Sequence, residues 1–200
     1  FCSNDLSSFY FDIRKDCLYC DDELSQKRKS CRFILKIIFD FLTAWFAPIL
    51  CFTTEEAWLS DNFNHKESIH LRMFPKTDNK WGNKNFGNKW KEIINVRKVV
   101  TSAIEIEREK KIIGSSLEAA AELTVSKKIK DSLNDINLND LFIVSSAKIV
   151  DKLPGKAFSL DGIKHTAVNI KKANGSKCER CWVISKEVVI NKNNLCNRCQ

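Results

Sequence analysis

The sequence predicts a mainly α-helical chain that continues into a small α/β unit and ends in a short cysteine-rich module. Three observations carry this prediction. Apolar residues recur at helical spacing through about the first 110 residues, short alternating segments follow Gly114, and four cysteines lie in the last 23 residues. The expected boundaries of the three parts are 1–114, 115–173 and 174–200.

The helical part is expected to contain one strongly apolar helix. In the segment CRFILKIIFDFLTAWF, the charged residues Arg32, Lys36 and Asp40 are spaced four apart and occupy one narrow face. A helix with so little polar surface is expected to be buried on most sides, as in the middle of a helical bundle. Helical spacing already holds from the first residues, so we expect the chain to be the C-terminal part of a longer protein.

A long amphipathic helix is predicted to close the helical part. It runs from Asn88 to Lys111, and Gly114 is expected to end it, because glycine readily takes the backbone conformation that terminates a helix. The α/β unit that follows is predicted to contain one helix and three strands, at 126–135 and at 117–125, 140–150 and 164–173 respectively.

The cysteine-rich module has the spacing of a zinc site. Two Cys-x-x-Cys pairs, Cys178 with Cys181 and Cys196 with Cys199, are separated by fourteen residues. Two such turns can place four thiolates around one ion, in the tetrahedral arrangement that zinc prefers. We therefore expect one structural Zn²⁺ without a catalytic role, because four protein ligands leave no position for water. A dithiol redox pair and an iron–sulfur cluster are the alternatives, since both use cysteine ligands or thiols.

The charge of the chain points to an anionic partner. The net charge is +8, and eight basic and two acidic residues between Lys164 and Gln200 give this tail +6 of it. Nucleic acid is therefore the first partner to consider, with an ordinary solvated surface as the alternative.

Other features exclude several classes of protein. Nine cysteines without a secretory signal indicate reduced thiols in a cytoplasm rather than a disulfide framework. The most apolar stretch is 12 residues long, which is too short to span a membrane. Cys17 and Cys20 lack a matching pair and are expected to be ordinary thiols. No catalytic residue is predicted, because no nucleophile or acid pair accompanies the histidines His65, His70 and His165.

Several segments resemble a known family. Two of them resemble the anticodon-binding helical domain of class I aminoacyl-tRNA synthetases for branched aliphatic amino acids: FCSNDLSSFYFDIRKDCLYCDD and RKSCRFILKIIFDFLTAWFAPILCFTTEEAW. Two more are similar to the connecting segment and the C-terminal zinc module of bacterial isoleucyl-tRNA synthetases: REKKIIGSSLEAAAEL and KCERCW followed by CNRC. The resemblance covers essentially all 200 residues.

The resemblance implies the tRNA-binding part of an isoleucine–tRNA ligase. The helical bundle would grip the anticodon loop of isoleucine tRNA, and the zinc module would close over the stem-loop from the other side. The family's HIGH and KMSKS signatures do not occur in the sequence. ATP binding and aminoacylation would therefore belong to separate catalytic and editing domains, and this chain is expected to be inactive alone. A cytoplasmic monomer without membrane contact is expected.

Seven residues are candidates for contact with tRNA: Arg97, Lys110, Lys111, Lys177, Arg180, Trp182 and Lys186. Ordinary structural roles stand beside this interpretation. Arg97 could lie at the edge of the core, and Lys110 and Lys111 could complement the dipole at the end of their helix. Trp182 could pack beneath the metal site or offer its flat face to a base.

Three other classes stay open. A stand-alone zinc ribbon that binds nucleic acid or a protein partner would use the same cysteines. A relative that serves valine tRNA would share the helical bundle. A purely structural tail would dock on the synthetase and touch no RNA. Competition by duplex DNA, discrimination between tRNAs and cross-linking of the tail to tRNA separate these classes.

Overall fold

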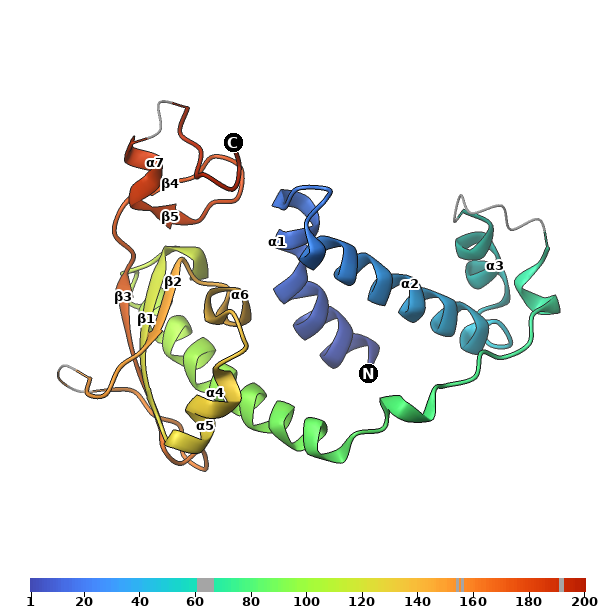
Figure 1. The fold of residues 1–200 in the computed structure, drawn as a ribbon, viewed down its shortest axis with the longest axis horizontal. Helices are drawn as coiled ribbons and strands as arrows, with labels where there is room; N and C mark the ends of the chain where they lie inside the picture. The colour runs from blue at the N-terminus through green and yellow to red at the C-terminus, as the bar shows by residue number, and fades with distance from the viewer. Residues whose placement is uncertain (61–66, 154, 156, 191–192) are drawn as a thin grey trace. The chain divides into compact units, whose positions relative to one another are not determined.

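The computed structural model describes residues 1–60, 67–153, 155, 157–190 and 193–200. The chain forms two compact units, one containing Phe1–Asp21 with Lys84–Gln200 and the other Asp22–Asn83. Helices make up most of the regular structure in the described residues, which confirms the mainly α class (Figure 1). The expected boundaries at 114 and 173 stay a prediction. No helix in the described part of the chain is both long and apolar enough to cross a membrane.

The smaller unit is built on a pair of packed helices, α2 (Gln26–Phe46) and α3 (Cys51–Ser60). The Ser25 side chain caps α2 by accepting a hydrogen bond from the backbone N–H of Arg28, which satisfies a donor that the helix leaves open. Two short 3₁₀ turns follow in this unit, η2 (Ile69–Leu71) and η3 (Asn79–Trp81).

The expectation that α2 is buried on most sides is wrong for this unit. Among its side chains only Cys31, Thr43 and Ala44 are buried, whereas Phe33 is 65% exposed. The reason is that α3 and η2 pack on part of α2 and Trp81 of η3 lies beside Phe41, which leaves other apolar side chains of the helix exposed. The apolar pattern of a helix predicts surface that can be buried, not the element that buries it.

The larger unit begins with two continuous helical segments. The first, η1 (Cys2–Phe11), is a π-helix in which the N–H of Leu6 bonds the carbonyl of Phe1 at 3.2 Å, five residues back. The second is α1 (Asp12–Cys20), whose buried face carries Ile13, Cys17 and Cys20. The unit then resumes at the long helix α4 (Lys84–Glu109).

The end of α4 differs from the prediction. Lys111, not Gly114, takes the left-handed conformation, with φ of 58°. The N–H of Ile112 bonds the carbonyl of Glu107 at 3.0 Å, and the N–H of Lys111 bonds that of Arg108 at 2.9 Å. This pair of hydrogen bonds is a Schellman motif, which stops the helix before the glycine is reached.

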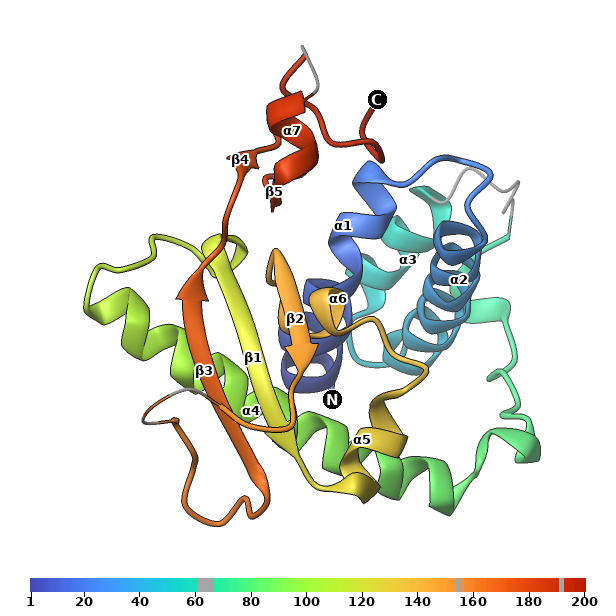
Figure 2. The same cartoon turned by 60° about the vertical axis from the view of Figure 1, so that its left-hand side comes forward.

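A three-stranded sheet lies beside α4 in the order β2-β1-β3. β1 (Ala119–Val125) pairs in parallel with β2 (Ser146–Ile149) and antiparallel with β3 (Thr166–Lys172). Figure 2 shows α4 crossing one face of this sheet. The 3₁₀ turn η4 (Ser116–Glu118) leads into β1.

The predicted strand at 140–150 is half wrong. Only β2 is extended, and α6 (Leu138–Phe142) forms where the strand was expected to begin. The Asn137 side chain caps this helix by accepting from the N–H groups of Asn139 and Asp140, and Ile143 ends it at φ of 56°. The cap outweighs the strand preference of the apolar run that follows it. The predicted helix at 126–135 is present as α5 (Lys127–Leu133).

One apolar core joins α4, the sheet and the short helices. The side chains at its centre are almost completely buried, among them Ile93, Val100, Leu123, Phe142 and Val168. Beyond β3 the chain enters the cysteine-rich module, which holds a two-stranded sheet of β4 (Ser176–Lys177) and β5 (Ile184–Ser185) and the helix α7 (Lys186–Ile190).

Candidate metal centre and nucleic-acid interface

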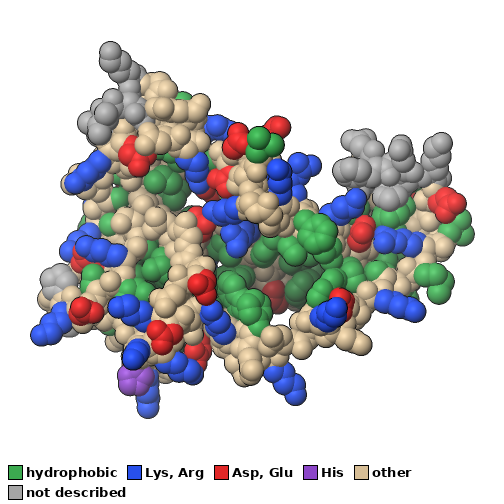
Figure 3. All heavy atoms as spheres, viewed as in Figure 1, with side chains coloured by type: hydrophobic (Ala, Val, Ile, Leu, Met, Phe, Trp, Pro, Cys, Tyr) green, Lys and Arg blue, Asp and Glu red, His purple; other side chains and the backbone are tan. Residues whose placement is uncertain are grey.

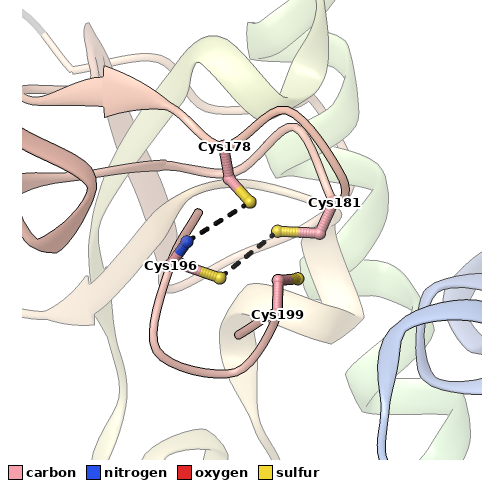
Figure 4. Close-up of side chains that lie close together, drawn as sticks. All are labelled: Cys178, Cys181, Cys196 and Cys199. Carbon is pink, nitrogen blue, oxygen red and sulfur yellow. Dashed lines mark hydrogen bonds between the residues drawn. The ribbon is translucent and has the colours of Figure 1, made fainter. Parts of the chain in front are cut away.

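The four cysteines of the module converge on one point. Their sulfur atoms all lie within 4.8 Å of one another, and the four side chains are buried (Figure 4). The Sγ atoms of Cys181 and Cys196 are 3.7 Å apart. A tetrahedral site with zinc–sulfur bonds of about 2.3 Å has sulfur–sulfur edges of about 3.8 Å. The residues present therefore fit one structural Zn²⁺ held by Cys178, Cys181, Cys196 and Cys199, with no ligand position left for catalysis.

Backbone groups prepare one of the thiols for metal. Burial by itself raises the pKa of Cys178, but hydrogen bonds from the backbone N–H groups of Cys181, Cys196 and Arg180 outweigh it and lower the pKa to about 6. The bond from the Cys196 N–H measures 3.4 Å. At Cys181 burial outweighs the hydrogen bond from the backbone N–H of Val183 and raises the pKa to about 11. Zinc binding must therefore displace protons from part of the ligand set.

Two backbone positions shape the module. Gly175 has φ of 132°, and a Cβ there would lie 2.4 Å from the backbone carbon of Ser185, so only glycine fits. Trp182 has φ of 66°, an uncommon value for a large residue, and its side chain is 59% exposed. The tryptophan therefore does not pack beneath the metal site, but presents most of its ring to solvent.

The second Cys-x-x-Cys pair lies on the buried face of α1. Cys17 and Cys20 are buried on α1, and the described residues contain no group of metal-binding side chains that includes them. Cys20 packs against the zinc cysteines. Burial and, to a smaller extent, the nearby Asp16 carboxylate raise the pKa of its thiol, which favours the neutral form. That both are ordinary thiols stays a prediction.

A cavity of about 760 Å³ opens beside the metal centre, between α1, α6 and the module. Three candidate contact residues, Arg180, Trp182 and Lys186, line it. The fourth from the module, Lys177, places its Nζ atom 4.8 Å from the centre of the Trp182 ring, a cation–π arrangement. The structure thus places three of the module's candidates in the cavity lining and the fourth, Lys177, against the Trp182 ring. That they touch tRNA stays a prediction.

The three candidates on and after α4 lie elsewhere. The guanidinium of Arg97 is mostly buried: it donates to the Asp12 carboxylate at 3.2 Å and to the carbonyl of Leu141. Burial lowers the pKa of Arg97, and Asp12 opposes that shift. Lys110 pairs with Glu107 at 2.8 Å, and Lys111 is exposed at the helix end. Arg97 therefore ties α4 to α1 and α6, and its contact with tRNA remains a prediction.

Sequence reasoning missed the wall that α1 contributes to the cavity. Lys15, Asp16 and Tyr19 line the cavity, as does Arg198 of the module. One signal in the sequence was available: both knuckles read Cys-x-Arg-Cys, so Arg198 occupies the same position as the candidate Arg180. Of the histidines, His70 and His165 lie outside the cavity lining, and His65 lies outside the described residues.

Comparison with known families matches both parts of the chain. Residues 1–125 match the anticodon-binding domain of tRNA ligase, and residues 175–200 match the zinc finger found in FPG and IleRS. The chain therefore belongs to the anticodon-binding domain family of tRNA ligases. The resemblance seen in the sequence is confirmed for both the helical part and the zinc module.

Curated relatives point to one kind of ligase. The chain is 41% identical to isoleucine–tRNA ligase of Bartonella henselae, 42% to that of Bradyrhizobium diazoefficiens and 43% to that of Agrobacterium fabrum, each over 190 residues. These matches cover 94% of this chain. The chain spans about a fifth of the length of the relatives, 20% for the first.

Proposed function

We propose that this chain is the tRNA-binding part of an isoleucine–tRNA ligase and holds the anticodon arm of isoleucine tRNA. The observation that supports this most is that two features occur together on the same chain. A segment of the anticodon-binding family is joined to a zinc module whose exposed tryptophan and basic side chains surround one cavity. Aminoacylation and ATP binding are assigned to catalytic and editing domains of the same ligase, acting as a monomer in the cytoplasm.

The chemistry of the cavity suits a single-stranded RNA loop. Unpaired bases bind proteins by stacking on aromatic rings, and Trp182 offers an exposed ring of this kind. Lys177 already lies over one face of that ring at 4.8 Å, which leaves the ammonium group next to any phosphate of a stacked nucleotide. Lys186 adds a cation from the cavity lining itself. Stacking would supply base contact, and the lysines would supply attraction to phosphate.

The basic side chains that would attract the RNA backbone are spread over the surface. On the face drawn in Figure 3, lysine and arginine side chains lie among aspartate and glutamate side chains. Such a distribution favours many weak phosphate contacts, which raise affinity without reading sequence. Discrimination between tRNAs then depends on the few positions where a base can be held, and the cavity beside the zinc site is the best candidate.

The proposal is tested by titrating the zinc-loaded chain with isoleucine tRNA, valine tRNA and duplex DNA at one near-physiological salt concentration. We expect isoleucine tRNA to bind most tightly. Equal affinity for the two tRNAs would reduce the chain to a general RNA-binding surface. Equal competition by duplex DNA would favour a stand-alone zinc ribbon, and absence of binding would favour a structural tail.

Two substitutions test the contribution of the cavity. Trp182→Ala should cost about 1–3 kcal/mol of tRNA binding, the usual value for one stacked base. Lys177→Glu should weaken binding about tenfold or more and make the salt dependence shallower, because a phosphate contact is lost. Lys130→Glu is the matched control, since Lys130 is an exposed lysine of α5, outside both the zinc module and the cavity lining. Equal effects of Lys177→Glu and Lys130→Glu would remove the cavity from the proposal.

A further inference from the structure

The two zinc knuckles present equivalent arginines to the same helix. In the sequence Cys-x-Arg-Cys, Arg180 belongs to the first knuckle and Arg198 to the second. Arg198 donates to both carboxylate oxygens of Asp16 on α1, from Nη1 at 2.6 Å and from Nη2 at 3.0 Å. Its Nη1 also lies 3.5 Å from the carboxylate of Asp21, directly after α1. Arg180 donates from Nη2 to the carbonyl of Tyr19 at 3.2 Å.

These contacts satisfy the C-terminal end of α1. The last carbonyls of a helix have no partner within the helix, and the carbonyl of Tyr19 is one of them. A guanidinium at this end also meets the negative pole of the helix dipole. The paired contact with Asp16 has the fork geometry that only arginine offers, so it fixes direction as well as distance. The Asp21 side chain is only 10% exposed, which shields part of this cluster from water.

Arg198 also lies next to the metal centre. In the sequence it stands between the ligands Cys196 and Cys199. The cation that pairs with Asp16 of α1 thus belongs to the knuckle that supplies two of the four ligands. Four thiolates around Zn²⁺ carry a net charge of −2, which makes a neighbouring arginine favourable while the metal is bound.

The opposite side of the module is fixed to the α/β region. The hydroxyl of Ser145, just before β2, accepts from the N–H of Ile184 at 2.7 Å and donates to the carbonyl of Leu117. The module is therefore attached on two sides, at α1 and beside the three-stranded sheet. The cavity described above lies between these attachments, and its lining includes residues of both.

We propose that Arg180 and Arg198 form a zinc-dependent clamp, in which the metal fixes both knuckles and the knuckle arginines position the end of α1. Zinc holds the two Cys-x-x-Cys turns in one arrangement, and each turn carries one arginine. Without the metal the arginines lose their fixed spacing, and the last turn of α1 loses its partners. Arg198 is accordingly a positioning residue for the wall of the cavity. This role does not depend on which nucleic acid the chain binds.

Hydrogen exchange of the full 200-residue chain tests the clamp, with zinc content measured in parallel. In the unaltered chain, removal of zinc should speed exchange of the backbone amides at residues 17–21 by about tenfold or more, because the helix end opens. Arg198→Gln should keep one zinc and show the same fast exchange with the metal bound. Arg180→Gln should speed exchange at these residues by less, since it removes only one hydrogen bond to a neutral carbonyl, that of Tyr19.

Two further variants make the result decisive. Lys186→Gln removes one positive charge from the same module without any contact to α1 in the described structure, and it should exchange like the unaltered chain. Asp16→Asn breaks the paired contact from the side of α1, so it tests the clamp even where Arg198→Gln fails to bind zinc. Slow exchange at residues 17–21 in zinc-loaded Asp16→Asn, or slow exchange in the unaltered chain after zinc removal, would overturn the proposal.

Discussion

The α/β region and the zinc module are held together by different forces. In the α/β region and α4, a continuous core of nearly inaccessible side chains includes Val99, Leu123 and Phe142. In the module, the buried group consists of the zinc cysteines with Val188 and Cys20, and the other apolar side chains packed on it are only partly buried. The first region is stabilised by burial of apolar surface, and the second depends on metal.

The difference has a consequence for how each region responds to change. Burial energy is shared by many side chains, so one substitution in a core removes a part of it. Metal binding energy is concentrated in four thiolates, so the loss of one ligand removes most of it. Perturbations of the two regions should therefore differ in size and should be separable by measuring zinc content beside stability.

The largest effect is expected from Cys196→Ser. Zinc binding to small modules of this kind contributes about 10–16 kcal/mol, and loss of a ligand should weaken zinc affinity by at least about three orders of magnitude. The module should lose its order while the α/β region keeps its own. Chelator competition measures the affinity, and hydrogen exchange locates the loss. Cys20→Ser is the control, because Cys20 packs on the same cluster but is not a ligand. Zinc loss in Cys20→Ser equal to that in Cys196→Ser would contradict the four-cysteine assignment.

Leu123→Ala should cost about 2–5 kcal/mol of unfolding free energy. Leu123 lies on the central strand β1 and is completely buried, so the substitution leaves a cavity in the core. Urea unfolding measures the change, and zinc content should stay at one ion per chain. Leu71→Ala is the control, since Leu71 is 77% exposed and its loss should change stability by less than about 0.5 kcal/mol. A similar cost for both would refute the assignment of the core.

The pH dependence of zinc affinity is a further property that only the metal-dependent module should show. Near pH 7 the Cys178 thiol is already ionised, because its pKa is about 6, whereas Cys181 and Cys199 have raised pKa values and hold protons that zinc must displace. Raising the pH removes this competition, so affinity should increase about 100-fold per pH unit between pH 7 and 9, for at least two protons released. Competition with a chelator of known pH dependence measures it. A change below tenfold per unit would show that the thiols are ionised before zinc arrives.

The smallest effect is expected from Lys111→Gly. Lys111 takes a left-handed conformation at the end of α4, which glycine adopts without strain, so stability should rise by about 0.5–1 kcal/mol. Lys98→Gly, at an exposed position inside α4, should instead lower stability by about 1 kcal/mol. Thermal unfolding of both variants gives the comparison. If Lys111→Gly also weakened tRNA binding, the predicted contact at Lys111 would gain support independently of stability.

The features that could be predicted from the sequence are those set by local chemistry. The ligand set of the zinc site follows from cysteine spacing, because two short turns bring their own sulfurs together. Long amphipathic helices such as α4 follow from periodicity. The strand at 140–150 was mispredicted because the Asn137 cap turned its first half into α6, and the end of α4 because Lys111 replaced the expected glycine.

The features that could not be predicted depend on contacts between distant segments. The pairing of Arg198 with Asp16 joins residues 182 positions apart, and no local pattern specifies it. The burial of the Arg97 guanidinium likewise requires Asp12 and Leu141 from two other elements. The left-handed backbone of Trp182 and the exposure of its side chain are likewise not revealed by the sequence Cys-Trp.

The measurement that tests the account most directly is the affinity of isoleucine tRNA for the same chain with zinc bound and with zinc removed, at one salt concentration. If the metal-held module is an RNA-binding surface, zinc removal should weaken binding by about tenfold or more, because stacking on Trp182 and the fixed lysine contacts are lost together. The core of the α/β region should remain protected from hydrogen exchange in both states. Unchanged affinity after zinc removal, with that core intact, would show that the module takes no part in holding the tRNA.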